Sequence, residues 1–217
     1  MPPKQNKKQQ QPQEAEESGW LTTFADMMTL LMTFFVLLFA MSTLDPVKLE
    51  NFGNSFGEQQ GSTKKTKKVS LSQINREVKE LVIDQDLQQQ VKVRMDARGV
   101  TLEIASDLAF QTGSATRSYA IEDFLIKLVP TMKKATYAIA VEGHTDNIPM
   151  RSATFPSNWE LSAARASAVI RYLTDQGVAA DKFRAIGFGD TAPKVANDSA
   201  ENRAKNRRVD ITFLTYG

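Results

Sequence analysis

The sequence predicts an α+β protein in which a single N-terminal transmembrane helix precedes a two-layer α/β domain with a mixed sheet. Residues 20–44 are almost all apolar. As a helix they would extend about 37 Å, enough to cross a hydrocarbon core of about 30 Å. Residues 91–217 instead alternate between strand-like and helix-like apolar patterns in the order β-α-β-α-β-β. That order is typical of a mixed sheet with helices on one face.

The composition argues against an enzyme. The chain has 217 residues, a formal net charge of +2 and no cysteine. The missing cysteines exclude disulfides, iron–sulfur clusters, thiolate zinc sites and cysteine nucleophiles. The single histidine, His144, excludes a His-rich metal site and leaves little for a nucleophilic triad. We therefore expect no catalysis, no metal, no cofactor and, from the near-neutral charge, no nucleic-acid partner.

The chain divides into five segments. Residues 1–19 are rich in Gln, Pro, Lys and Glu without an apolar face, so we expect a disordered cytoplasmic tail. The transmembrane helix follows at 20–44. An amphipathic segment at 45–60 and a linker with a helix at 61–90 lead to the folded domain at 91–217.

The lysines around the apolar run predict its orientation. Trp20 at its start suits an interfacial anchor. Lysines are more frequent before the run than directly after it, with Lys4, Lys7 and Lys8 against Lys48. This bias places the N-terminus in the cytoplasm. A cleaved signal peptide ending near Ala40-Met41-Ser42 is the alternative, but the run is longer than the roughly 7–15 residues of a signal core and contains an acid.

That acid is Asp26. A carboxyl group at the centre of a membrane helix costs about 2.5–3.5 kcal/mol, so a functional role is the default interpretation. Thr22, Asp26, Thr29 and Thr33 are spaced so that they share one helix face, which should contact other helices or a hydrated path. A carboxylate there can take up and release a proton or bind sodium. The alternative is that the polar stripe only joins helices.

Two short elements should follow the span. Asp45-Pro46 predicts the cap and first position of a helix, and three apolar residues share one face of it: Leu49, Phe52 and Phe56. Residues 62–68 form a basic linker. Ser70 with Gln73 is a capping-box pattern that opens another helix. If residues 45–90 were fully extended, they would span at most about 150 Å.

The folded domain should begin with a β-hairpin near Val91, because two alternating apolar runs flank Arg98-Gly99. Its other elements follow from periodicity and from cap and stop signals. They are a helix at 121–132, a strand at 137–141, a helix capped by Asn158 and ended by Gly177, and strands at 183–188 and 208–214.

Several motifs of this domain resemble the OmpA-like peptidoglycan-binding family. They are Phe110-x-x-Gly113-Ser114-Ala115, Gly143-His144-Thr145-Asp146, Asn158-x-x-Leu161-Ser162-x-x-Arg165-Ala166, Gly187-Phe188-Gly189 and Asn202-Arg203-x-x-Asn206-Arg207-Arg208-Val209. The resemblance implies that Asp146 and Arg165, with Asn158 as a weaker candidate, hold the diaminopimelate of the wall peptide. An acceptor anion and a bidentate cation suit a ligand with a free ammonium and a free carboxylate.

Alternatives to this assignment stay open. Asp146 and Arg165 could instead form a structural ion pair. Residues 147–157 form a longer loop than in shorter family members. The basic run Arg203, Lys205, Arg207 and Arg208 could contact an anionic matrix or be a solvated face.

The segment from Trp20 to Leu38, WLTTFADMMTLLMTFFVLL, resembles the B subunit of flagellar stators, the MotB/PomB family. The resemblance implies a homodimer within a ring of MotA- or PomA-type A subunits, in the bacterial inner membrane with the C-terminal domain in the periplasm. Asp26 would bind the coupling ion, Na+ or H+, and residues 46–60 would form a plug. Phe24-Ala25-Asp26 and Leu30-Leu31 look more like the sodium-driven branch.

Three other functions remain open. A plain single-pass peptidoglycan anchor would use Asp26 only structurally. An energiser of the TolR/ExbD kind also has one span with an aspartate, but the OmpA-like motifs count against it. An enzyme would place a metal on His144 and Asp146, although no further ligand cluster is apparent in the sequence.

Overall fold

The computed structural model describes residues 19–42 and 69–215 of the chain. These ranges belong to two separate units, an apolar helix and a folded domain. The predicted tail (except Gly19), the segment with Leu49, Phe52 and Phe56, and the basic linker at 62–68 lie outside the described residues, so those predictions stay predictions.

The N-terminal unit is the helix α1, Gly19–Ser42. By length and composition, its stretch from Gly19 to Ala40 can cross a membrane. Its large apolar side chains are exposed in the isolated chain, as expected of a helix whose surroundings are lipid or other subunits. The predicted helix at 20–44 is therefore present, starting one residue earlier and ending two residues earlier.

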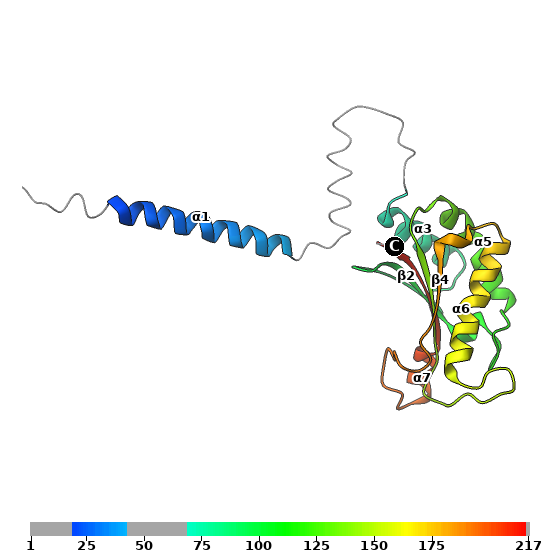
Figure 1. Ribbon diagram of the computed structural model, residues 1–217. Coiled ribbons are helices and arrows are strands. Elements are labelled where there is room, and N and C mark those ends of the chain that lie inside the picture. Colours follow the sequence, from blue (N-terminus) through cyan, green and yellow to red (C-terminus); the bar gives the residue numbers. More distant parts are fainter. Residues whose placement is uncertain (1–18, 43–68, 216–217) are drawn as a thin grey trace, which may run out of the picture. The chain divides into compact units, whose positions relative to one another are not determined.

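The folded domain is built on one five-stranded mixed sheet (Figure 1). The strand order is β1-β2-β5-β3-β4, and only β3 and β4 run parallel. The strands are β1 (Val91–Asp96), β2 (Gly99–Ala105), β3 (Ile139–His144), β4 (Phe183–Gly187) and β5 (Arg208–Leu214). The mixed sheet and its opening hairpin are as predicted, and Gly99, which begins β2 directly after the turn, has a φ of 133°.

Three long helices pack against the sheet, and between them lies the core. They are α3 (Leu71–Asp84), α5 (Tyr119–Lys134) and α6 (Asn158–Asp175). Alternate strand residues supply the apolar side, such as Leu102, Ile211 and Val141, which lie in one cross-strand row and are fully buried. The residues between them are polar, because successive side chains of a strand point to opposite faces.

The domain begins earlier than the expected boundary at residue 91. Helix α3 starts as predicted, with the Ser70 side chain accepting a hydrogen bond from the Gln73 N–H. Its apolar face is part of the same core as the strands, and so is Val69 before it. The segment 69–90 is therefore a structural part of the domain and not a linker.

Three short elements were not predicted from the sequence: α4 (Ser106–Ala109), the 3₁₀ helix η1 (Ala180–Lys182) and α7 (Ala200–Asn206). The N-cap of α6 was also misplaced. Ser157 is the cap, and its hydroxyl accepts from the Trp159 N–H. Asn158 is the first helical residue, which leaves its side chain available for another task.

Candidate functional site

The helix α1 carries the first candidate site. Because it is continuous through residues 22–33, the four predicted side chains fall within about 60° of one helix face. The Thr29 and Thr33 hydroxyls donate to the carbonyls of Asp26 and Leu30, each at 2.8 Å. Such bonds satisfy the hydroxyl hydrogen locally. Each threonine oxygen keeps its lone pairs for a ligand or a neighbouring helix.

The second candidate site lies where β3 ends and α6 begins, and two glycines allow the close approach. A Cβ on Gly143 would lie 2.1 Å from the Ser162 carbonyl oxygen, and one on Gly187 would lie 2.7 Å from the Ala163 nitrogen. The Ser162 hydroxyl, fully buried, accepts from the Gly189 N–H at 3.0 Å. These contacts fix the first turns of α6 against β3 and β4, and so fix Arg165, which follows on that helix.

A cleft of about 410 Å³ opens at this place. Asp146 and Arg165 both line it, together with Asn158, Phe110 and Arg207. The structure thus gathers all three predicted peptidoglycan-binding residues around one hollow, although they come from separate parts of the chain.

Asp146 is held from two sides. Its Oδ1 accepts from the Ile148 N–H at 3.1 Å, and its Oδ2 accepts from Arg207 Nη1 at 3.0 Å. The side chain is about 10% exposed. Each carboxylate oxygen can accept a further hydrogen bond, so a ligand ammonium could still bind there. The considered Asp146–Arg165 ion pair is not the observed one, because the partner of Asp146 is Arg207.

Arg165 is positioned mainly by uncharged groups. Its Nε donates to the Ser114 carbonyl at 2.9 Å, and its guanidinium carbon lies 5.1 Å from the centre of the Phe110 ring. Burial, and then the nearby charge of Arg207, lower the pKa of Arg165 to about 10. Within residues 69–215, Nη1 and Nη2 form no hydrogen bond. This is the end of the guanidinium that binds a carboxylate bidentately.

Asn158 supports the loop that carries Asp146. Its side-chain amide donates to the carbonyls of Asp146 at 3.2 Å and Ile148 at 3.0 Å. The residue is buried. Asn158 therefore acts on the site as a positioning residue through the loop backbone.

Arg207 is the site residue that the sequence analysis did not single out. It appeared there only within a basic run and within one of the OmpA-like motifs, without a role of its own. Its guanidinium lies between Asp146 and Asp107, whose Oδ2 is 3.6 Å from Nη2. Arg207 stands directly before β5, so the strand sets the direction of its side chain. The charge of the residue alone does not reveal that direction.

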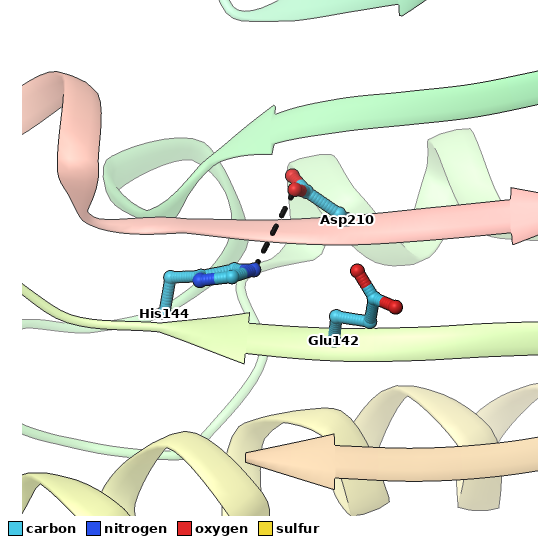
Figure 2. Close-up of side chains that lie close together, drawn as sticks. All are labelled: Glu142, His144 and Asp210. Atoms are coloured by element: carbon cyan, nitrogen blue, oxygen red, sulfur yellow. Dashed lines mark ion pairs between the residues drawn. The ribbon is translucent and has the colours of Figure 1, made fainter. Parts of the chain in front are cut away.

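The polar side of the sheet holds a buried cluster of Glu142, His144 and Asp210 (Figure 2). Figure 2 shows the three side chains pointing toward one another, with His144 Nε2 3.6 Å from Asp210 Oδ2. Arg98 donates to Glu142, and Arg208 donates to Asp210 at 3.0 Å. A divalent cation would therefore compete with two guanidinium groups. The sequence suggested His144 with Asp146 as metal ligands, whereas the structure groups His144 with Glu142 and Asp210.

Two pKa shifts of this cluster oppose each other in their effect on stability. Burial, followed by the charges of Arg208 and Arg98, lowers the pKa of His144 to about 3. Between about pH 3 and 6.5 the imidazole of His144 is therefore protonated in the unfolded chain but not in the folded one. Because the unfolded chain binds the extra proton, the stability of the fold rises with pH in this range. Burial raises the pKa of Asp210 to about 6. Because the folded chain keeps this proton longer, stability falls between about pH 4 and 6.

The helix and the cleft define a class of protein: a chain with one helix that can cross a membrane and an α/β domain with a cleft lined by charged side chains of both signs, within the described residues. The family model described as "Membrane MotB of proton-channel complex MotA/MotB" matches residues 3–59, and that of the OmpA family matches residues 109–207. The uncharacterized protein YtxE of Bacillus subtilis is 36% identical, covering 90% of this chain and 88% of its own. Motility protein B of the same organism is 29% identical, covering 97% and 96%.

Among solved structures, the periplasmic domain of Helicobacter pylori MotB (residues 78–256) superposes with a TM-score of 0.54 at 31% identity. The match covers 58% of this chain and 83% of that one. The chain belongs to the MotB family, with an OmpA-family C-terminal domain. It is a MotB-like stator protein with a peptidoglycan-binding domain, and it is not an enzyme.

Proposed function

We propose that this chain couples ion flow at Asp26 to motor torque, while the cleft around Asp146 and Arg165 anchors it to the cell wall. One observation carries the anchoring part. Asp146 and Arg165 line the same cleft without bonding to each other. An anionic acceptor and a bidentate cationic donor are thus both available to one ligand.

The ligand that fits is an amino acid with a free ammonium and a free carboxylate, such as the diaminopimelate of a wall peptide. The ammonium would donate to Asp146, and the carboxylate would accept from Nη1 and Nη2 of Arg165. Phe110 under the guanidinium restricts its rotation, which reduces the entropy lost on binding.

A sedimentation assay tests the anchor. Full-length chain in detergent is mixed with insoluble peptidoglycan, and the bound fraction is measured after centrifugation. Because charge-assisted hydrogen bonds contribute about 1.5–3 kcal/mol each, Arg165→Ala should weaken binding at least about tenfold. Arg171→Ala is the matched control, since Arg171 is an exposed arginine of the same helix. Equal retention of both variants would contradict the assignment.

Asp26 is proposed as the coupling-ion site, with Thr22, Thr29 and Thr33 as the polar face beside it. Within α1, the Asp26 carboxylate forms no hydrogen bond or ion pair. A charge moving through the membrane potential releases about 2.3 kcal/mol per 100 mV. This is the free energy that loading and unloading of Asp26 would transfer to the A-type subunits.

Asp26→Asn keeps the size and polarity of the side chain but cannot ionise. We expect swimming to stop while the variant still inserts in the membrane and still binds peptidoglycan. Asp26→Glu, which keeps the charge, should retain part of the torque. Normal torque with Asn at this position would leave only a wall anchor.

We further propose sodium as the coupling ion, because Phe24-Ala25-Asp26 and Leu30-Leu31 resemble the sodium-driven branch of the family. Swimming speed should follow external sodium when an uncoupler has removed the proton gradient. If the uncoupler stops swimming at every sodium concentration, the ion is the proton.

The assembly proposed is two copies of this chain inside a ring of A-type subunits, with the N-terminus in the cytoplasm and the domain in the periplasm. A second copy or an A-type subunit gives the polar face of α1 a partner away from lipid. Native mass spectrometry of the co-purified complex tests the dimer. Protease added outside intact spheroplasts should remove the domain and spare α1.

A further inference from the structure

A second hollow adjoins the cleft. It measures about 230 Å³, and Asp107 and Arg207 line both hollows. Its walls come from β1, β2, α7 and the loop after β4. We call it the basic groove, defined by Lys92, Glu103, Asp107, Lys194, Lys205, Arg207 and Arg208.

The basic groove carries an excess of positive charge. Five cationic side chains line it, against the two carboxylates of Glu103 and Asp107. Glu103 is buried and already bonded to two cations, Arg94 at 2.8 Å and Lys194. Arg207 and Arg208 are paired with Asp146 and Asp210, so the positive charge that stays in excess is that of the lysines, and it gives the groove a positive potential that attracts anions.

Two of these cations have no carboxylate partner among the described residues of the folded domain. Lys92 and Lys205 are exposed, and in the described part of the folded domain neither forms an ion pair. Lys205 donates only to the Asn202 side chain, at 3.0 Å. Both ammonium groups can therefore turn toward a ligand without breaking a salt bridge.

The groove is also held in shape. Asn206, which is fully buried, accepts from the backbone N–H groups of Lys194 and Val195 at 2.8 and 3.0 Å. Its amide donates to the Val195 carbonyl at 2.8 Å and to the Asn197 side chain at 2.9 Å. The loop that carries Lys194 is thereby fastened to the end of α7, so one wall of the groove is preorganised.

We propose that the basic groove binds free carboxylates of the same peptidoglycan stem peptide whose ammonium-bearing residue occupies the cleft. The proposal rests on the proposed function of the cleft. The cleft and the groove adjoin at Asp107 and Arg207. A peptide held at Arg165 therefore passes these two residues before it reaches the lysines. Stem peptides carry several carboxylates along a short backbone, so one ligand can satisfy both hollows.

The test uses two synthetic stem peptides and full-length chain in detergent, with affinity measured by titration at several salt concentrations. In the first peptide all carboxylates are free. In the second, every carboxylate except that of the cleft residue is amidated. The variant is Lys92→Glu with Lys205→Glu, and its matched control is Lys134→Glu, since Lys134 is exposed in the last turn of α5, away from both hollows.

The wild type and Lys134→Glu should bind the free peptide more tightly than the amidated one. The double variant should lose about tenfold for the free peptide, show a weaker salt dependence, and bind the amidated peptide as the wild type does. Unchanged affinity for the free peptide, or equal loss for both peptides, would overturn the inference. Poly(glycerol phosphate) is titrated as a third ligand. If the double variant loses affinity for this polymer and for neither peptide, the groove binds a phosphodiester polymer and the inference is overturned.

Failure of the cleft itself gives a different pattern. Arg165→Ala should lose both peptides. If the wild type binds neither peptide, the proposed function is wrong, and the inference about the groove is overturned with it.

Discussion

Gly143 gives a sharp test of how the cleft is built, because it stands where α6 touches β3. In Gly143→Ala the new Cβ would lie 2.1 Å from the Ser162 carbonyl oxygen and 2.8 Å from its carbon, whereas ordinary contacts are 3.4–4 Å. Both atoms belong to backbone, so no side chain can turn aside. Helix α6 would have to retreat by about 1 Å or more, which costs roughly 1–3 kcal/mol in a packed core.

For a domain of this size, each kcal/mol corresponds to about 2–4 °C in melting temperature. Gly143→Ala should therefore melt about 2–12 °C below the wild type in a soluble fragment that starts at Val69. Peptidoglycan binding should fall as well, because Arg165 moves with α6.

Gly177→Ala is the control, since it introduces the same methyl group at the end of the same helix. Its φ of 84° makes alanine strained there, at about 1 kcal/mol, but the nearest atom is the flexible end of Lys133. This variant should lose a few degrees and keep its binding. If Gly143→Ala melts and binds like the wild type, the close approach of α6 does not position the cleft.

The other predictions concern the loop and the buried cluster. Asn158→Ala leaves the Ile148 carbonyl without its donor and the Asp146 carbonyl with only the Thr145 hydroxyl, so peptidoglycan binding should weaken about three- to tenfold while the fold persists; binding equal to wild type in the sedimentation assay would show that the loop needs no such support. Asp210→Asn removes the carboxyl group whose raised pKa lowers stability as the pH rises, so only the opposite effect of His144 remains from this pair. The stability of this variant from urea unfolding should then rise from pH 4 to 6.5 by up to about 1.4 kcal/mol per unit, and a flat profile would mean that His144 is not held neutral by the fold.

Local signals in the sequence were sufficient for most elements of the fold. The capped helix after Ser70 and the hairpin at Arg98-Gly99 depend on neighbours in the chain, and both are present. The sequence nonetheless predicted that the helix after Ser70 lies between the membrane span and the folded domain, and not within that domain. Periodicity shows that a helix has an apolar face but does not show what covers that face, and here the cover is the core of the domain.

The site was predictable to the extent that motifs mark it. Asp146 and Arg165 were assigned by their motifs, and the structure places both around one cleft. Their bonding partners could not be deduced, because the Asp146–Arg207 pair joins residues far apart in sequence. For Asn158 the error was local: Ser157 and Asn158 are both good caps, and the first of them took that position.

The earlier start of the domain changes how far the anchor can reach. If residues 45–90 had been linker, an extended chain of about 150 Å would have been available. Because α3 packs into the core from Val69 onward, only residues 43–68 separate the two described units. Their full extension is at most about 90 Å. A wall ligand must lie within that distance plus the distance from Val69 to the cleft, and a cleft with preset cations binds it there with less loss of entropy than mobile side chains would.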